Sequence, residues 1–122
     1  MKLSSDTRAD ANVVVGYSAR EVRLRERTLA RSAIVTVDRV VDWPGAAFDT
    51  LRPQALDAVL ALQPALIVLA SGARQRFPPP EVYAHVYGRG VGLEVMEIGA
   101  ACRTYNLLLA EDRRVALALL FD

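Results

Sequence analysis

Two short arginine-bearing segments hold most of the residues in this chain that are suited to binding a ligand. The first covers residues 71–78 (SGARQRFP), and the second, residues 97–103 (EIGAACR), leads into a predicted helix. The first turn of a helix presents unpaired amide N–H groups and about half a positive charge. Arg74, Arg76 and Arg103 would add three guanidinium groups beside that helix end. The pattern therefore fits a cradle for a phosphate, a carboxylate or an acidic side chain.

The candidate contact residues lie in these two segments or directly after them, and most are small, polar or basic. They are Ser71, Gly72, Arg74, Gln75, Arg76, Gly99, Cys102, Arg103, Thr104 and Asn106. The simpler alternative is that the glycines form tight turns and the arginines are solvated or pair with carboxylates of the chain itself. The first segment also lacks the Gly-Lys-Ser/Thr ending of a phosphate-binding P-loop.

The single cysteine does not by itself indicate an enzyme. Cys102 falls in the first turn of the predicted helix, where the helix end and Arg103 favour a thiol pKa below the free value of about 8.5. A thiol nucleophile also needs a base, and the one histidine, His85, falls in a different predicted helix. With one cysteine and one histidine, a tetrahedral cysteine site or a two-histidine metal site is excluded. We expect no catalytic residues, no metal and no cofactor.

Composition favours a single folded domain. The chain has 122 residues, of which 52% are hydrophobic and 24% are charged, so it can bury one core. Fifteen basic and 14 acidic residues give a formal charge of +1, which argues against nucleic acid as a partner. The polar start of the chain resembles neither a signal peptide nor a mitochondrial presequence, and no apolar run approaches the roughly 20 residues of a membrane span. We expect residues 1–12 to be disordered, residues 13–122 to form one domain, and the protein to be cytoplasmic.

The first half of the chain has the pattern of short antiparallel strands. Three valines at 13–15 precede a glycine, residues 22–27 alternate between two faces, and residues 33–37 form another β-branched run. Tight turns are predicted near residues 25–27 and at residues 31–32.

The second half changes to a helical period. Apolar residues recur at helical spacing between 51 and 62, and the apolar run at 66–70 is typical of a strand buried on both faces. A helix beginning at Pro80, a strand at 92–96, a helix at 100–110 and a buried strand at 115–121 follow. This order predicts an α/β domain with a parallel or mixed sheet covered by helices, and the last strand should be central or nearly so. Loops that leave neighbouring parallel strands share one edge, so Arg74 and Arg103 should approach the same cleft.

Three segments resemble a small domain family of largely unknown function. They are residues 67–79, 90–96 and 99–106, and the similarity covers nearly the whole chain from about Val13. The family includes assembly factor 3 of mitochondrial respiratory complex I, an adipogenesis-associated vertebrate protein and many uncharacterised bacterial proteins. The resemblance implies a three-layer α/β domain, with a central mixed sheet flanked by helices and an additional N-terminal antiparallel β portion. It implies no reaction, and Ser71 departs from the family pattern, in which Gly-Thr-Gly is common.

Two functions remain open at this level. The first is a non-enzymatic interaction protein with an unidentified protein partner, which helps to assemble a larger complex such as a respiratory one. The alternative is a small-molecule or anion-binding domain, or an enzyme, that uses the cleft between the 71–78 and 97–103 loops. Both a monomer and a homodimer are compatible with the sequence.

Overall fold

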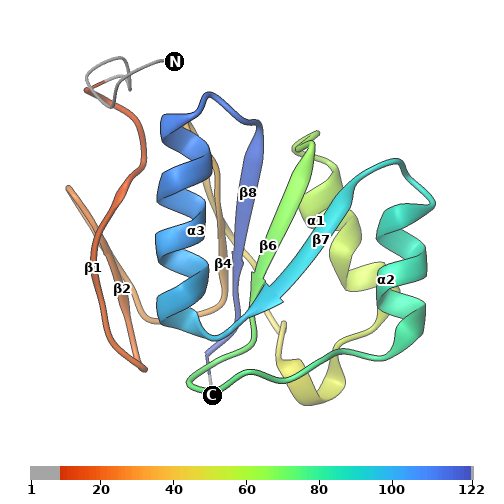
Figure 1. Ribbon diagram of the computed structural model, residues 1–122. Helices are drawn as coiled ribbons and strands as arrows, with labels where there is room; N and C mark the ends of the chain where they lie inside the picture. The colour runs from red at the N-terminus through yellow and green to blue at the C-terminus, as the bar shows by residue number, and fades with distance from the viewer. Residues whose placement is uncertain (1–8, 122) are drawn as a thin grey trace.

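A computed structural model describes residues 9–121 of the chain (Figure 1). The N-terminus expected to be disordered lies mostly outside these residues. Within them, Ala11 is buried and the Asn12 N–H donates to the Val37 carbonyl at 2.9 Å. The packed domain therefore extends back to Ala11, two residues before the boundary at Val13 that the sequence favoured.

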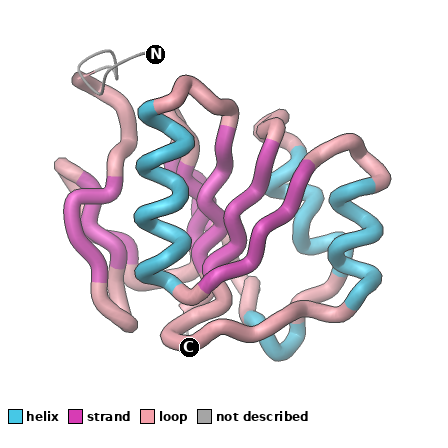
Figure 2. Tube along the Cα trace, in the orientation of Figure 1, coloured by secondary structure: helices cyan, strands magenta, loops and turns pink. Residues whose placement is uncertain are grey.

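The described strands form two separate sheets (Figure 2). The smaller sheet is antiparallel, in the order β1-β2-β3, with β1 (Val14–Tyr17), β2 (Val22–Leu24) and β3 (Thr28–Leu29). The larger sheet has the order β5-β4-β8-β6-β7, with β4 (Ala33–Val35), β5 (Val40–Asp42), β6 (Leu66–Ala70), β7 (Gly92–Met96) and β8 (Val115–Leu119). β6 runs parallel to β7 and β8, whereas β4 runs antiparallel to β5 and β8. The larger sheet is therefore mixed, as expected.

Helices cover both faces of the five-stranded sheet. On one face, α3 (Ile98–Ala110) lies between this sheet and the three-stranded sheet, as Figure 1 shows. On the other face lie α1 (Asp57–Leu60), α2 (Pro80–Tyr87) and the short 3-10 helix η3 (Pro53–Leu56), with a further 3-10 helix, η2 (Phe48–Thr50), nearby. The arrangement confirms the α/β fold class, in which the N-terminal antiparallel sheet is an additional layer outside α3.

The final strand has the central place predicted for it. β8 pairs with β4 on one side and β6 on the other, and all five of its residues are buried. Leu117 and Leu119 pack into the core beside α3, whereas Ala116 and Ala118 pack toward α1 and α2. A strand with apolar side chains on both faces is stable only where both faces are covered.

Two local predictions differ from the structure. The turn at residues 25–26 is present, with the Leu24 N–H bonded to the Arg27 carbonyl at 2.8 Å, but residues 31–32 do not join a hairpin. β3 and β4 belong to different sheets, so the chain crosses from one sheet to the other there. In place of one helix over residues 51–62, the chain forms two short helices, η3 and α1, which cover only residues 53–60. None of the helices between residues 9 and 121 has the length and apolar character needed to cross a bilayer.

Candidate functional site

The structure brings the two arginine-bearing loops together. They leave the carboxyl ends of β6 and β7, which pair in parallel register up to Ala70 and Met96. The Ser71 N–H donates to the Met96 carbonyl at 2.8 Å, and the Ile98 N–H donates to the Gly72 carbonyl at 2.9 Å. Backbone bonds therefore tie the two loops at the edge where ligands bind in open α/β sheets.

Part-buried hydrogen bonds fix the backbone of the 71–78 loop. Ser71 is fully buried, its Oγ donates to the Arg74 carbonyl at 2.8 Å, and the same atom accepts from the Arg76 N–H at 3.1 Å. Gly72 has a φ of 100°, a left-handed conformation that costs energy for residues with a Cβ. These two residues hold the loop in shape, and the Ser71 hydroxyl is taken up by bonds within the loop instead of facing an external anion.

Two polar side chains of this loop also turn toward the protein. The guanidinium of Arg76 donates to the Ser71 carbonyl at 2.9 Å and lies 3.3 Å from the Asp49 carboxylate. It also stacks 4.3 Å from the centre of the Phe48 ring, a cation–π contact. Gln75 donates from Nε2 to the Val95 carbonyl at 2.9 Å.

The amino end of α3 is occupied by a carboxylate of the chain itself. Glu97 is the N-cap residue, and its two carboxylate oxygens accept from the Gly99 and Ala100 N–H groups at 2.6 and 2.8 Å. Arg103 donates to the Tyr17 hydroxyl and lies 3.9 Å from Glu97. The sequence predicted that these N–H groups would bind an external anion. Such an anion would first have to displace the Glu97 carboxylate.

Removing the capping carboxylate should both destabilise α3 and open its N–H groups. We expect Glu97→Ala to lower the free energy of unfolding by about 0.5–2 kcal/mol, the usual range for a lost N-cap. Inorganic phosphate should then shift the amide resonances of Gly99 and Ala100 in the variant and leave them unmoved in the wild type. Glu94→Ala, at an exposed acid on β7, is the matched control and should change stability by less than about 0.5 kcal/mol. Phosphate-induced shifts of equal size in the wild type would contradict the assignment.

Cys102 is a core residue. It is 1% exposed, and burial together with the nearby Glu97 charge raises its thiol pKa to about 12, against the lowering effect of Arg103. The sequence-based expectation of a lowered pKa is therefore wrong, because desolvation outweighs the helix end and the arginine. The thiol stays protonated at neutral pH and packs in the apolar core that α3 shares with the strands of both sheets.

The last two candidates bond within the protein as well. Thr104 donates from Oγ1 to the Met96 sulfur at 3.3 Å. Asn106 joins α3 to β1, since its side chain accepts from the Val14 N–H at 2.9 Å and donates to the Val14 carbonyl at 2.8 Å. This attachment has no signature in the sequence, because the two residues lie 92 positions apart.

Two side chains of the 71–78 loop remain on the surface. Arg74 is exposed, and no side-chain partner is found for it within residues 9–121. Phe77 is 69% exposed, the highest value among the exposed large hydrophobic residues. Sequence reasoning missed Phe77 as a candidate contact residue.

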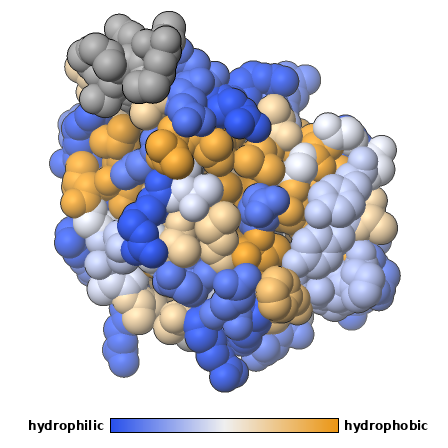
Figure 3. Space-filling view, viewed as in Figure 1, coloured by the Kyte–Doolittle hydropathy of each residue, from blue (hydrophilic) through white to orange (hydrophobic). Residues whose placement is uncertain are grey.

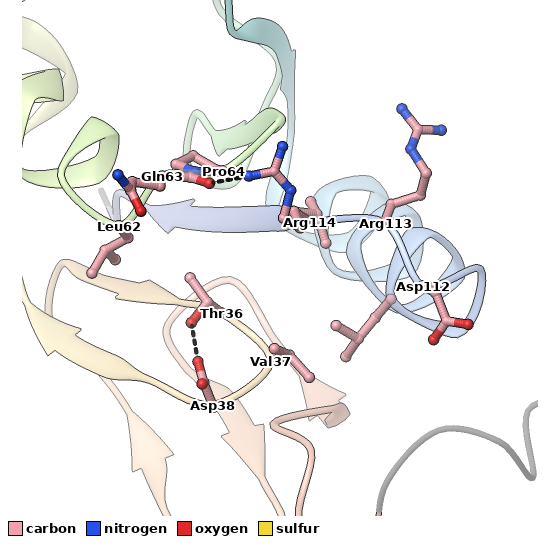
Figure 4. A pocket seen from close by; sticks show the side chains of 11 residues that line it. Thr36, Val37, Asp38, Leu62, Gln63, Pro64, Asp112, Arg113 and Arg114 are labelled. Atoms are coloured by element: carbon pink, nitrogen blue, oxygen red, sulfur yellow. Dashed lines mark hydrogen bonds between the residues drawn. The ribbon is translucent and has the colours of Figure 1, made fainter.

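A well-formed hollow lies at the opposite edge of the sheet (Figure 4). It has a volume of about 360 Å³ and lies where β8 begins, between the β4–β5 turn and the loops that precede β6 and β8. Val37, Leu62 and Leu109 supply apolar lining, and Asp38 lies at one wall, where the Thr36 hydroxyl donates to its carboxylate at 3.3 Å.

The two arginines at this hollow differ in direction. Arg114 donates to the Gln63 carbonyl at 3.0 Å, whereas Arg113 points away from the hollow in Figure 4. No pattern in the sequence predicts this hollow, because its lining comes from segments that are far apart in the chain.

Similar proteins include solved structures, a protein named for a membrane and an assembly factor. A Xanthomonas campestris protein with an NMR structure is 44% identical, with a TM-score of 0.81, over 88% of this chain and 83% of that one. The "13 kDa major membrane protein" of Francisella tularensis is 29% identical over 71% of this chain and 72% of that protein. NADH dehydrogenase (ubiquinone) 1 alpha subcomplex assembly factor 3 of Danio rerio is 28% identical over 88% of this chain. The matched region is 63% of that assembly factor, so this chain spans less than two thirds of its length.

The family assignment follows from a match over almost the entire described chain. The matching family model carries the description "Protein of unknown function (DUF498/DUF598)" and covers residues 14–120, from the first residue of β1 to just past β8. The resemblance seen in residues 67–79, 90–96 and 99–106 is thereby confirmed, and the chain belongs to the DUF498/DUF598 family.

Proposed function

We propose that this protein is a non-enzymatic, protein-binding factor that helps to assemble a larger complex. The observation that carries the proposal is the similarity to assembly factor 3 over 88% of the chain. By that relationship, the candidate complex is a respiratory NADH dehydrogenase. The partner is then a protein subunit or an assembly intermediate of that complex.

The 71–78 loop is the surface that best fits such a partner. Exposed apolar side chains are scattered over several elements, and in Figure 3 hydrophilic residues interrupt the apolar surface. Apolar character alone therefore does not single out a contact surface. The loop combines an exposed aromatic residue, Phe77, with an exposed arginine, Arg74, and aromatic residues and arginine are enriched in protein interfaces relative to the rest of the surface.

The loop is also organised before any partner arrives. Ser71 and Arg76 hold its backbone through part-buried hydrogen bonds, so less conformational entropy is lost on binding. The alternative, a small anion bound between the loops, is less favoured. Glu97 takes up the N–H groups of α3, and Arg76 and Arg103 already bond within the protein.

The test is quantitative recovery of partners by a tagged protein expressed at its native level in the source cell. The wild type should recover subunits of a multi-subunit complex, with respiratory NADH dehydrogenase subunits the first to look for. Phe77→Ala and Arg74→Ala should each reduce that recovery by about fivefold or more, which corresponds to about 1 kcal/mol of binding.

The matched control is Tyr87→Ala, which removes an aromatic side chain that is 54% exposed on α2. It should leave partner recovery unchanged, and Phe77→Ala and Arg74→Ala should retain the unfolding free energy of the wild type to within about 0.5 kcal/mol. Failure of the wild type to recover any complex subunit reproducibly would refute the assembly role. Full recovery by Phe77→Ala and Arg74→Ala would refute the loop as its contact surface.

A further inference from the structure

The outer edge of the three-stranded sheet is open at β3. The Leu24 N–H bonds to the Arg27 carbonyl, and Val22 pairs with Leu29, so the intervening Thr28 belongs to a non-hydrogen-bonded pair. The N–H and C=O groups of such a residue point away from the neighbouring strand. Among the strands of residues 9–121, the sheet order places β2 on one side of β3 and none on the other. Thr28 therefore presents a free donor and a free acceptor at the edge.

Ala30 extends this edge beyond the strand. It lies two residues after Thr28, so in an extended chain its backbone groups point in the same direction. Both residues are exposed, and no backbone bond is found for Ala30 within residues 9–121. Unpaired edge groups of this kind are a template for pairing with another strand.

A groove runs along the open edge. It consists of two adjoining hollows of about 250 and 530 Å³, which share Ala30, Arg31 and Asp42. The first hollow is also lined by Thr28 and Leu29, and the second by the turn at residues 43–45 and by Phe121. The second wall of the groove is therefore supplied by the end of β5 and the turn that follows it. An added segment would have side-chain contacts on this wall as well as backbone bonds to β3.

The groove has an excess of positive charge. Arg27 and Arg31 stand at the two ends of the β3 edge, both are exposed, and no hydrogen-bond or ion-pair partner is found for either side chain within the described chain. Two neighbouring arginines differ, since Arg23 pairs with Glu21 at 3.0 Å and Arg25 donates to the Ala11 carbonyl at 2.7 Å. Asp42 is the acid that lines both hollows. Among the described residues that line the groove, two unpaired cations stand against one carboxylate, which favours an acidic occupant.

We propose that a partner protein adds an extended, acidic segment to the open edge of β3, with its carboxylates facing Arg27 and Arg31. The backbone bonds to Thr28 and Ala30 would supply affinity, and the arginines would select acidic side chains. This surface is separate in sequence from the 71–78 loop. The inference therefore does not depend on the assembly role proposed above.

The probe is a synthetic peptide, acetyl-Val-Asp-Val-Asp-Val-Asp-amide, added to isotope-labelled protein and followed by amide NMR. We expect shifts centred on Thr28, Ala30 and Asp42, and slower hydrogen exchange at the Thr28 and Ala30 amides when the peptide is bound. The peptide in which lysine replaces aspartate should bind at least about tenfold more weakly, because it meets like charges.

Two pairs of variants separate backbone pairing from charge. Thr28→Pro removes the outward N–H, which the fold itself does not use, whereas Thr28→Val keeps it; only the first should lose peptide binding. The double change Arg27→Glu and Arg31→Glu should weaken binding about tenfold or more. Arg113→Glu, an exposed arginine next to β8, should leave it unchanged. If Thr28→Pro fails to fold, the charge-reversal pair still decides.

Three results would overturn the inference. The first is an acidic peptide that leaves the Thr28 and Ala30 amides unmoved at millimolar concentration. The second is equal binding of the acidic and the lysine peptides, which would remove the role of the arginines. The third is a set of shifts confined to the 71–78 loop, which would place the peptide on the surface of the assembly proposal instead.

Discussion

Replacing Leu117 by alanine is expected to lower the free energy of unfolding by about 2–5 kcal/mol. Leu117 is fully buried at the middle of β8, with paired strands on both sides and α3 packed over its side chain. The truncation removes apolar contacts and leaves a cavity that the flanking strands cannot close. Because small domains are stable by only about 5–15 kcal/mol, the loss should be a large fraction of the total.

Urea unfolding followed by circular dichroism measures the effect, with Leu107→Ala as the matched control. Leu107 is 60% exposed on α3, so the same truncation there should change stability by less than about 0.5 kcal/mol. A loss below about 1 kcal/mol for Leu117→Ala would contradict the central position of β8.

Replacing Asn106 by leucine is expected to lower the free energy of unfolding by about 2–4 kcal/mol. The variant leaves both the N–H and the C=O of Val14 without their bonds to the Asn106 amide, and each unsatisfied group costs about 1–3 kcal/mol. The loss of stability should be local at first. The substitution should therefore increase the amide exchange rate more in β1 and β2 than in β8, each compared with the wild type.

Thr104→Val is the control for this change, because the Thr104 hydroxyl donates to the sulfur of Met96, a weak acceptor. Its cost should stay below about 1 kcal/mol. Equal exchange rates in β1 for Asn106→Leu and the wild type would show that the three-stranded sheet is held mainly by other contacts, such as the bond from the Tyr105 hydroxyl to the Asn12 carbonyl at 2.7 Å.

The sequence by itself determined the elements whose cause is local. The apolar run at residues 66–70 is β6, Pro80 begins α2, and the doubly apolar final strand is central, as predicted. The period of the hydrophobic residues, the backbone geometry of proline and the need to cover apolar faces all depend on residues that are close together in the sequence. The meeting of the 71–78 and 97–103 loops could be predicted for a similar reason, since it follows from the direction of two parallel strands.

Tertiary structure decided where the side chains of those loops point and what surrounds them. Arg76 turns inward because Phe48 and Asp49, distant in the sequence, stand beside it. Cys102 has a raised pKa because the sheets packed on both sides of α3 exclude water, which outweighs the local effect of the helix end. Asn106 hydrogen-bonds to β1 because folding brings the backbone of Val14 next to its side chain. Local pattern selects an element, but solvent exposure and bonding partners depend on residues that only the folded chain brings together.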